Sequence, residues 1–254
     1  MPFYRSKDMD AYMGFAGIYD LLMDDFDYPA WTDYYLKLIG ERGVRVQNIC
    51  ECACGTGSIT VELAKRGYRV LGVDISRDML ENAAEKARNA GQMIQFVCQD
   101  MCALQLSKPV DALICTCDGV NYLTNDKRVS AFFEAAYRQI KPGGVFAFDI
   151  SSAHKLKNVI GNAFFGEERD DVAYLWQNRL DNDIVTMDIT FFIRAEDEFY
   201  ERIQETHRQK AHEIDVIVAL MEKAGFKDIC VYGDRTFAAP KEDELRVHFS
   251  AVRE

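Results

Sequence analysis

Four short segments of this sequence combine residue types that bind an organic ligand. In residues 51–57 an acidic residue precedes the small residues Ala53, Gly55 and Gly57, which let a backbone approach a ligand closely. A helical pattern follows at once, and a helix N-terminus attracts negative charge. Asp74 comes next along the chain. A carboxylate that follows a glycine turn in this way can accept hydrogen bonds from both hydroxyls of a ribose.

The other two segments carry groups that suit a base and a second substrate. Asp100 can accept a hydrogen bond from an adenine amino group, and Met101 can pack near the base. Residues 115–122 follow, with two cysteines, an aspartate, an asparagine and Tyr122. A glycine turn or a loop aspartate alone is commonly structural. Four such segments in succession indicate one ligand site.

These segments alternate with elements that would bring them to one edge of a sheet. Apolar runs predict five strands, each followed by turn residues or by helical spacing. The predicted strands are residues 46–52, 68–74, 93–98, 110–117 and 145–150. Strands that alternate with helices favour a parallel sheet covered on both faces. In such a sheet ligands bind beyond the carboxyl ends of the strands, where the four segments fall.

The rest of the chain departs from this alternation. Short polar turns between strand-like segments predict a three-stranded antiparallel insertion, followed by a helix and two further strands. The insertion strands are 174–179, 184–194 and 199–208, and the later elements are 211–224, 228–232 and 246–252. The predicted fold class is α/β, with a Rossmann-like seven-stranded mostly parallel sheet and helices on both faces. We expect one domain made of a helical N-terminal cap (1–44), a cofactor-binding core (45–150), an antiparallel lid insertion (151–210) and C-terminal elements (211–254).

Composition narrows the class of protein and its partners. The 254 residues carry a net charge of −11, which disfavours binding to a nucleic-acid backbone. The chain starts without the apolar stretch of a secretory signal, and no apolar run reaches the ~20 residues that span a bilayer. We therefore expect a cytoplasmic protein without a membrane partner. The eight cysteines are typical of reduced thiols, and without C-x₂-C pairs we expect no metal site.

The motifs resemble those of class I S-adenosylmethionine-dependent methyltransferases. The glycine motif of that family is acidic-x-Gly-x-Gly-x-Gly. Residues 51–57, Glu-Cys-Ala-Cys-Gly-Thr-Gly, match it with alanine in place of the first glycine. Residues 73–76, 99–101 and 140–144 resemble further family signatures in the expected order. Outside the core, the aromatic N-terminal segments and the lid insertion resemble a subgroup of small methyltransferases that includes glycine and amino-sugar N-methyltransferases.

The resemblance implies S-adenosylmethionine as the cofactor, S-adenosylhomocysteine as its product, and a role for each matching residue. Ala53 and Gly55 would approach the methionine part, and Asp74 would hold the ribose. The residues implied around the adenine are Ile75, Asp100 and Met101. The backbone carbonyl of Cys117 would lie beside the sulfonium. The full implied set is Tyr12, Trp31, Glu51, Ala53, Gly55, Gly57, Asp74, Ile75, Met79, Asp100, Met101 and Cys117.

The acceptor side of such a site needs few chemical groups. Methyl transfer from a sulfonium is an in-line displacement, so alignment and exclusion of water can suffice. An amine acceptor must lose a proton, which a nearby His, Tyr or carboxylate can assist. The candidate catalytic residues are Tyr122, Tyr19 and His207, with His154 just past the fifth strand. Both histidines also fit ordinary surface positions, and the aromatic residues Tyr12, Tyr19 and Trp31 also fit plain core packing.

A small-molecule acceptor, methylated at nitrogen or oxygen, is the first expectation for the substrate. The Asn/Asp-Pro-Pro-Tyr motif of base methylases is absent, and no proline precedes Cys115 or Cys117 as in cytosine-5 enzymes. A tRNA or protein substrate, or a cofactor-binding scaffold without catalysis, is an alternative. A dehydrogenase is a distant one, because Ser58 or Thr60 stands where the third glycine of G-x-G-x-x-G is needed. A monomer and a homodimer both fit.

Overall fold

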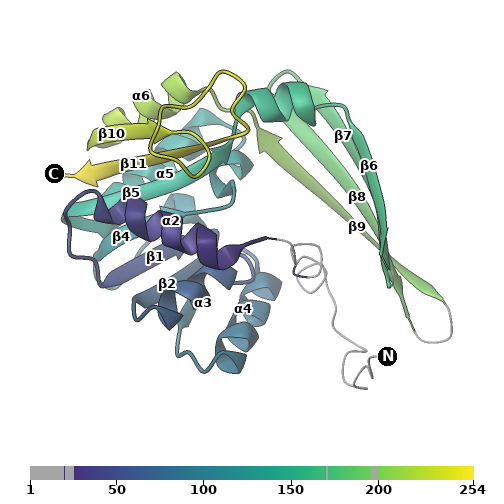
Figure 1. The fold of residues 1–254 in the computed structure, drawn as a ribbon, viewed down its shortest axis with the longest axis horizontal. Coiled ribbons are helices and arrows are strands. Elements are labelled where there is room, and N and C mark those ends of the chain that lie inside the picture. Colours follow the sequence, from purple (N-terminus) through teal and green to yellow (C-terminus); the bar gives the residue numbers. More distant parts are fainter. Residues whose placement is uncertain (1–19, 21–25, 170, 196–198) are drawn as a thin grey trace.

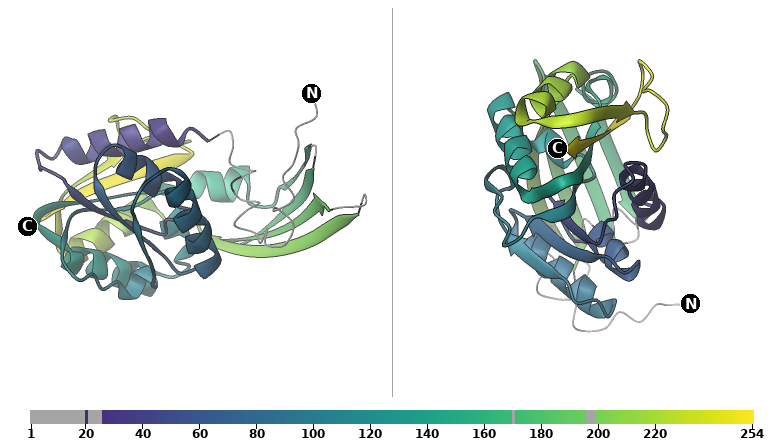
Figure 2. Two further views of the ribbon diagram at one scale, coloured as in Figure 1. Left: turned by 90° about the horizontal axis from the view of Figure 1, so that it is seen from below. Right: turned by 90° about the vertical axis from the view of Figure 1, so that its left-hand side faces the viewer.

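The fold is seen in a computed structural model that describes residues 20, 26–169, 171–195 and 199–254. These residues form two β-sheets, which we call the core sheet and the lid sheet. The core sheet is covered by helices, and the lid sheet projects from it (Figure 1). The view from below shows the same projection, and in the end-on view the lid strands lie behind the core sheet (Figure 2).

The core sheet has seven strands and is mostly parallel. Its strands are β1 (Asn48–Cys52), β2 (Arg69–Asp74), β3 (Gln95–Cys98), β4 (Val110–Cys115), β5 (Ile140–Ser151), β10 (Phe226–Tyr232) and β11 (Arg246–Arg253). Their order across the sheet is β10-β11-β5-β4-β1-β2-β3. The pairs among β1 to β5 are parallel, whereas β11 is antiparallel to both β5 and β10. The expected seven-stranded sheet is confirmed.

Helices cover both faces of the core sheet (Figure 1). They are α2 (Tyr28–Gly40), α3 (Ser58–Lys65), α4 (Arg77–Asn89), α5 (Asp126–Gln139) and α6 (Ile214–Ala224), with short turns η1 (Met101–Ala103), η2 (Gly119–Tyr122) and the π-helical η3 (Lys155–Val159). The buried residues of α2 and α3 pack in one apolar cluster with the sheet. Those of α5 and α6 pack in a second cluster, so the sheet lies between two helical layers.

The helix α5 shows why the sequence forms a helix at this place. Four apolar residues at helical spacing are fully buried: Val129, Phe132, Phe133 and Ala136. Asn125 caps the helix, because its side chain accepts a hydrogen bond from the backbone N–H of Arg128. The rings of Phe132 and Phe133 each lie 5.6 Å from that of Phe146 on β5. These contacts fix α5 on the sheet.

The lid sheet is antiparallel and joins strands in chain order. Its strands are β6 (Phe164–Arg169), β7 (Val172–Asp181), β8 (Ile184–Arg194) and β9 (Tyr200–Lys210). The order across the sheet is β6-β7-β8-β9. A tight turn joins β7 to β8, with Asn182 in the left-handed region at φ 55°. Asparagine tolerates that conformation better than most residues.

The expectation of a three-stranded insertion is wrong, because β6 is a fourth strand. Its sequence, Phe-Phe-Gly-Glu-Glu-Arg, does not alternate between apolar and polar residues. The strand lies at the edge of the lid sheet and is mostly exposed, so burial does not impose alternation on it. Several boundaries also differ, and the two largest differences are that β5 begins at Ile140, not at residue 145, and that α6 begins at Ile214, not at residue 211.

The N-terminal cap is described in part. Its second half is the helix α2, which Asp27 caps by accepting a hydrogen bond from the backbone N–H of Ala30 at 2.9 Å. The earlier predicted helix, with Tyr12 and Tyr19, lies outside the described residues. Among the helices that the structure describes, none is long and apolar enough to cross a membrane.

A buried carboxylate of the core sheet lies beneath the turn after β1. Glu51 of β1 accepts hydrogen bonds from the hydroxyls of Thr60 and Thr116, the latter at 2.9 Å. Thr60 belongs to α3 and Thr116 follows β4, so Glu51 joins three elements beneath the turn after β1. Burial, and then the charge of Asp74, raises the pKa of Glu51 to about 7, although the two hydroxyl donors oppose the rise.

Glu51 is expected to make the stability of the fold depend on pH. A carboxyl with a higher pKa in the folded chain binds its proton more tightly there. The free energy of unfolding therefore falls as the pH rises from about 4.5 to about 7. The neutral substitution Glu51→Gln removes this component, which amounts to about 3 kcal/mol at most. Urea unfolding of both proteins across this range measures the difference, and a difference that stays constant with pH would contradict the account.

Candidate active site

The turn after β1 is built from residues with left-handed backbone. Ala53, Gly55 and Gly57 have φ angles of 52°, 53° and 73°. A Cβ on Gly57 would lie 2.8 Å from the Cβ of Ala83 on α4, so glycine is required there. A Cβ on Gly55 would meet nothing within 4 Å, so the turn exposes its backbone to open space at that point. A Cβ on Gly119 would come within 2.9 Å of Ala53, so the turns after β1 and β4 touch.

Asp74, at the end of β2, is tied to this turn. Its Oδ2 accepts the backbone N–H of Gly55 and its Oδ1 accepts that of Ser76, both at 2.9 Å. Each carboxylate oxygen accepts more than one hydrogen bond, so Asp74 keeps capacity for two ligand hydroxyls. Ile75 follows with 67% of its surface exposed, and Met79 is half-buried on the next helix. Ile75 and Met79 therefore offer an apolar surface next to the carboxylate of Asp74.

Asp100, just beyond β3, is more constrained than its sequence position indicated. It accepts the backbone N–H of Cys102 at 2.9 Å, and both of its oxygens accept hydrogen bonds from the Arg128 guanidinium. Partial burial raises the pKa of Asp100, but these donors outweigh it and hold the pKa below its usual value. The half-buried Met101 packs against the core beside it.

The turn after β4 is unusual, because two consecutive non-glycine residues are left-handed. Cys117 and Asp118 both have a φ of 55°. The carboxylate of Asp149 on β5 accepts both of their backbone N–H groups, at 2.8 and 3.0 Å. It also accepts the hydroxyl of Tyr35 at 2.7 Å. Asp149 is fully buried, and this set of donors stabilises a backbone that would otherwise be strained.

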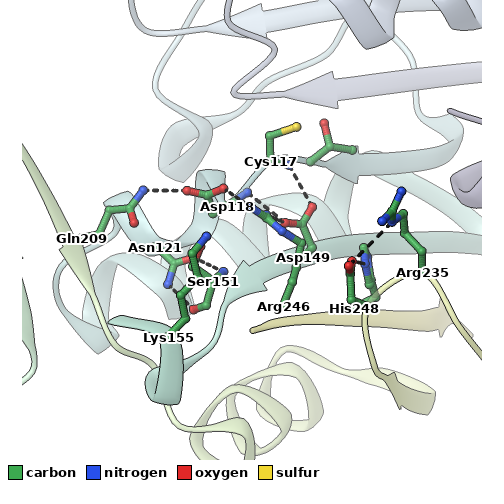
Figure 3. Close-up of polar contacts among 12 residues, drawn as sticks. Cys117, Asp118, Asn121, Asp149, Ser151, Lys155, Gln209, Arg235, Arg246 and His248 are labelled. Atoms are coloured by element: carbon green, nitrogen blue, oxygen red, sulfur yellow. Dashed lines mark hydrogen bonds and ion pairs between the residues drawn. The ribbon is translucent and has the colours of Figure 1, made fainter. Parts of the chain in front are cut away.

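Arg246 of β11 supplies the positive charge for this cluster (Figure 3). Its guanidinium pairs with Asp149 and, at 2.9 Å, with Asp118. Burial alone would raise the pKa of Asp149, but the charge of Arg246 and the hydrogen bonds lower it below its usual value. The other oxygen of Asp118 accepts the side-chain amide of Gln209 on the lid strand β9, at 2.7 Å. The buried Asn121 adds a tie, because its amide donates to the backbone oxygen of Lys210 at 2.9 Å.

Two of the predicted catalytic residues meet above this turn. The ring of Tyr122 packs edge-on against that of His207 on β9, with centroids 5.9 Å apart. Partial burial lowers the pKa of His207, so its ring is neutral at neutral pH. Partial burial and the charge of Asp118 raise the pKa of Tyr122, so its hydroxyl stays protonated. The structure thus brings together one residue from the core and one from the lid.

The remaining predicted residues lie in other surroundings. Trp31 is almost fully buried, and Arg246 lies over its ring at 5.3 Å. His154 contacts Asn158 through its ring at 3.2 Å. Tyr12 and Tyr19 fall outside the described residues. Within the described ranges, no group of three His, Cys, Asp or Glu side chains could hold a metal ion.

Sequence reasoning singled out the segment after β4 that contains Asp118 and Asn121, but it missed the polar cluster that these two residues form with three distant residues. Its members are Asp118, Asn121, Asp149, Gln209 and Arg246. Asp149 carried a signal, since it is the one charged residue in the apolar run of residues 145–150. Its partner Arg246 lies on a distant strand, and only the pairing of β5 with β11 brings the two together.

Known proteins match this chain over its core and over its full length. A family model described as a methyltransferase domain matches residues 49–144. YqeM of Bacillus subtilis, whose name places it among the methyltransferases, is 33% identical over 95% of this chain and 97% of its own. A crystal structure of an S-adenosylmethionine-dependent methyltransferase from Clostridium acetobutylicum has a TM-score of 0.85 at 32% identity, covering 94% and 97%. A glycine/sarcosine N-methyltransferase of Halorhodospira halochloris is 29% identical over 57% of this chain and 56% of its own.

The first two relatives share over 30% identity with nearly the whole chain, so they cover the lid sheet as well as the core. The glycine turn, the carboxylate at the end of β2 and the seven-stranded sheet agree with the family match. The chain belongs to the class I S-adenosylmethionine-dependent methyltransferases.

Proposed function

We propose that this methyltransferase acts on a small-molecule acceptor, at a nitrogen or oxygen atom held between the core and the lid sheet. The observation that carries the proposal is the contact of Tyr122 with His207 next to the turn at Cys117. This contact provides two polar side chains beside the carboxyl end of β4, where a second substrate binds in such a sheet. The contact is separate from the turn after β1 and from Asp74, which we assign to the cofactor.

The residues around the first turn fit S-adenosylmethionine. The backbone at Gly55 faces open space, and Asp74 keeps hydrogen-bonding capacity for two ribose hydroxyls. The exposed Ile75 offers an apolar surface for the adenine. The cofactor supplies an electrophilic methyl group on a positively charged sulfur.

Tyr122 and His207 can hold and deprotonate the acceptor group that attacks the methyl carbon. The hydroxyl of Tyr122 is protonated and can donate a hydrogen bond to the acceptor. The neutral ring of His207 can take the proton that an amine or hydroxyl gives up when it is methylated.

Charge and relatives both support a small acceptor over a macromolecule. A net charge of −11 disfavours tRNA. The glycine/sarcosine N-methyltransferase that matches part of this chain is named for small amine acceptors. A protein substrate, and a scaffold that binds the cofactor without transfer, are outcomes of the transfer experiment below.

The role proposed for Asp74 is tested by its removal. Asp74→Ala is expected to weaken binding of S-adenosylhomocysteine by about 1–3 kcal/mol, because hydrogen-bonding partners are left unpaired. Isothermal titration calorimetry measures the dissociation constant. Asp78→Ala is the matched control, since this exposed carboxylate lies in the first turn of α4. Equal affinities for wild type and Asp74→Ala would remove Asp74 from the cofactor site.

The acceptor class is tested by following a labelled methyl group. Wild-type protein with labelled S-adenosylmethionine and a cell extract is expected to label a small-metabolite fraction, which mass spectrometry then identifies. His207→Gln is expected to lower kcat by about 10²–10⁴-fold while cofactor binding persists. His154→Gln, whose ring contacts Asn158, is the control and keeps the wild-type rate. Label found only in RNA or protein, or no transfer despite cofactor binding, contradicts the proposed acceptor.

A further inference from the structure

One of the contacts between the lid strand β9 and the core is made by a buried side-chain amide. Gln209 has 4% of its surface exposed, and its Nε2 donates to Oδ2 of Asp118 at 2.7 Å. Figure 3 shows Gln209 reaching from the lid strand toward Asp118, with Arg246 on the other side of that carboxylate. A side-chain amide this deeply buried is not needed for solubility, so the contact has a structural or functional purpose.

Asp118 is a fixed partner for this amide. Its second oxygen pairs with Arg246 at 2.9 Å, and its own backbone N–H donates to Asp149 at 3.0 Å. Its left-handed backbone leaves little freedom to relax. The bond from Gln209 therefore ties the lid strand to a core turn that is itself held in place by Arg246 and Asp149.

Because Gln209 and His207 lie on one strand, holding Gln209 in place also constrains the position of His207. Residues two apart on a strand point to the same face, so the direction of Gln209 sets the direction of His207. On the core side, Tyr122 ends the short turn η2 that starts directly after Asp118. Asn121 also holds the end of this strand, but its hydrogen bond goes to the backbone oxygen of Lys210 and not to a side chain.

We propose that Gln209 is a positioning residue whose amide holds the lid strand in register with the core, so that His207 faces Tyr122 across the acceptor site. This inference rests on the proposed function, since it names what assembles the two halves of that site. It predicts that the Tyr122–His207 contact depends on the Gln209 side chain. A purely structural amide would affect stability and leave the ring contact unchanged.

The test replaces the amide without shortening the side chain. Gln209→Met keeps length and volume and removes the donor to Asp118. Gln204→Met is the matched control, because Gln204 lies on the same strand but on its exposed face. Gln209→Asn is a second variant that keeps a buried amide with too short a reach. Thermal unfolding first establishes which variants are folded.

The primary readout is the NMR spectrum of the His207 ring, assigned through His207→Gln. The titratable groups near this ring include Tyr122 on η2 and Glu205 on β9, and Met187 is its cross-strand partner on β8. In the wild type and in Gln204→Met we expect ring-to-ring cross-relaxation with Tyr122 and a titration midpoint below 6.5. In Gln209→Met and Gln209→Asn we expect loss of the cross-relaxation and a midpoint that rises toward 6.5.

The second readout separates this inference from the proposed function. With an acceptor fraction that wild type methylates, Gln209→Met is expected to lower kcat about a hundredfold through misplacement, with cofactor affinity unchanged. If wild type transfers no label, the NMR comparison still decides the role of Gln209. A His207–Tyr122 contact that persists in folded Gln209→Met or Gln209→Asn would overturn the inference.

Discussion

The carboxylate of Asp149 organises the end of the sheet where the site forms. It is fully buried, and a buried charge without partners is costly. The structure therefore surrounds it with donors from three separate elements: Tyr35 of α2, the N–H groups of the turn after β4, and Arg246 of β11. Satisfying this one charge brings those elements together, and it holds two non-glycine residues in a left-handed backbone.

The two sides of the site follow from this arrangement. The turn at Cys117 touches the glycine turn through Gly119 and Ala53. The side proposed for the cofactor therefore adjoins the turn after β4. The carboxylate of Asp118 links this turn to the lid, because one of its oxygens accepts a hydrogen bond from Arg246 and the other accepts one from Gln209 of the lid strand. The lid sheet otherwise projects away from the core, so a few polar contacts at its base fix its position (Figure 1). A methyl donor and an acceptor could thus meet over a single rigid turn.

From the sequence, the glycine turn and the carboxylate at the end of β2 could be predicted to lie together, whereas the polar cluster around Asp149 could not be predicted. Asp74 ends β2 and Gly55 lies in the turn after the neighbouring strand β1, and the motif that joins them is local and specific. Asp149 and Arg246 interact only because β11 runs antiparallel beside β5, which no local pattern encodes. The strand β6 was missed for a related reason: an exposed edge strand needs no alternating pattern. Tyr122 and His207 were identified singly, but their contact depends on how the lid docks.

The measurement that tests this account most directly is a double-mutant cycle on the buried ion pair. Asp149→Asn alone is expected to lower the free energy of unfolding by about 3–5 kcal/mol, because the buried charge of Arg246 loses the fully buried one of its two carboxylate partners. Adding Arg246→Met removes that charge, so the double variant is expected to lose clearly less than the sum of the two single losses. Urea unfolding of the four proteins gives the coupling energy. Additive losses, or an Asp149→Asn variant as stable as wild type, would show that the fold does not depend on this carboxylate.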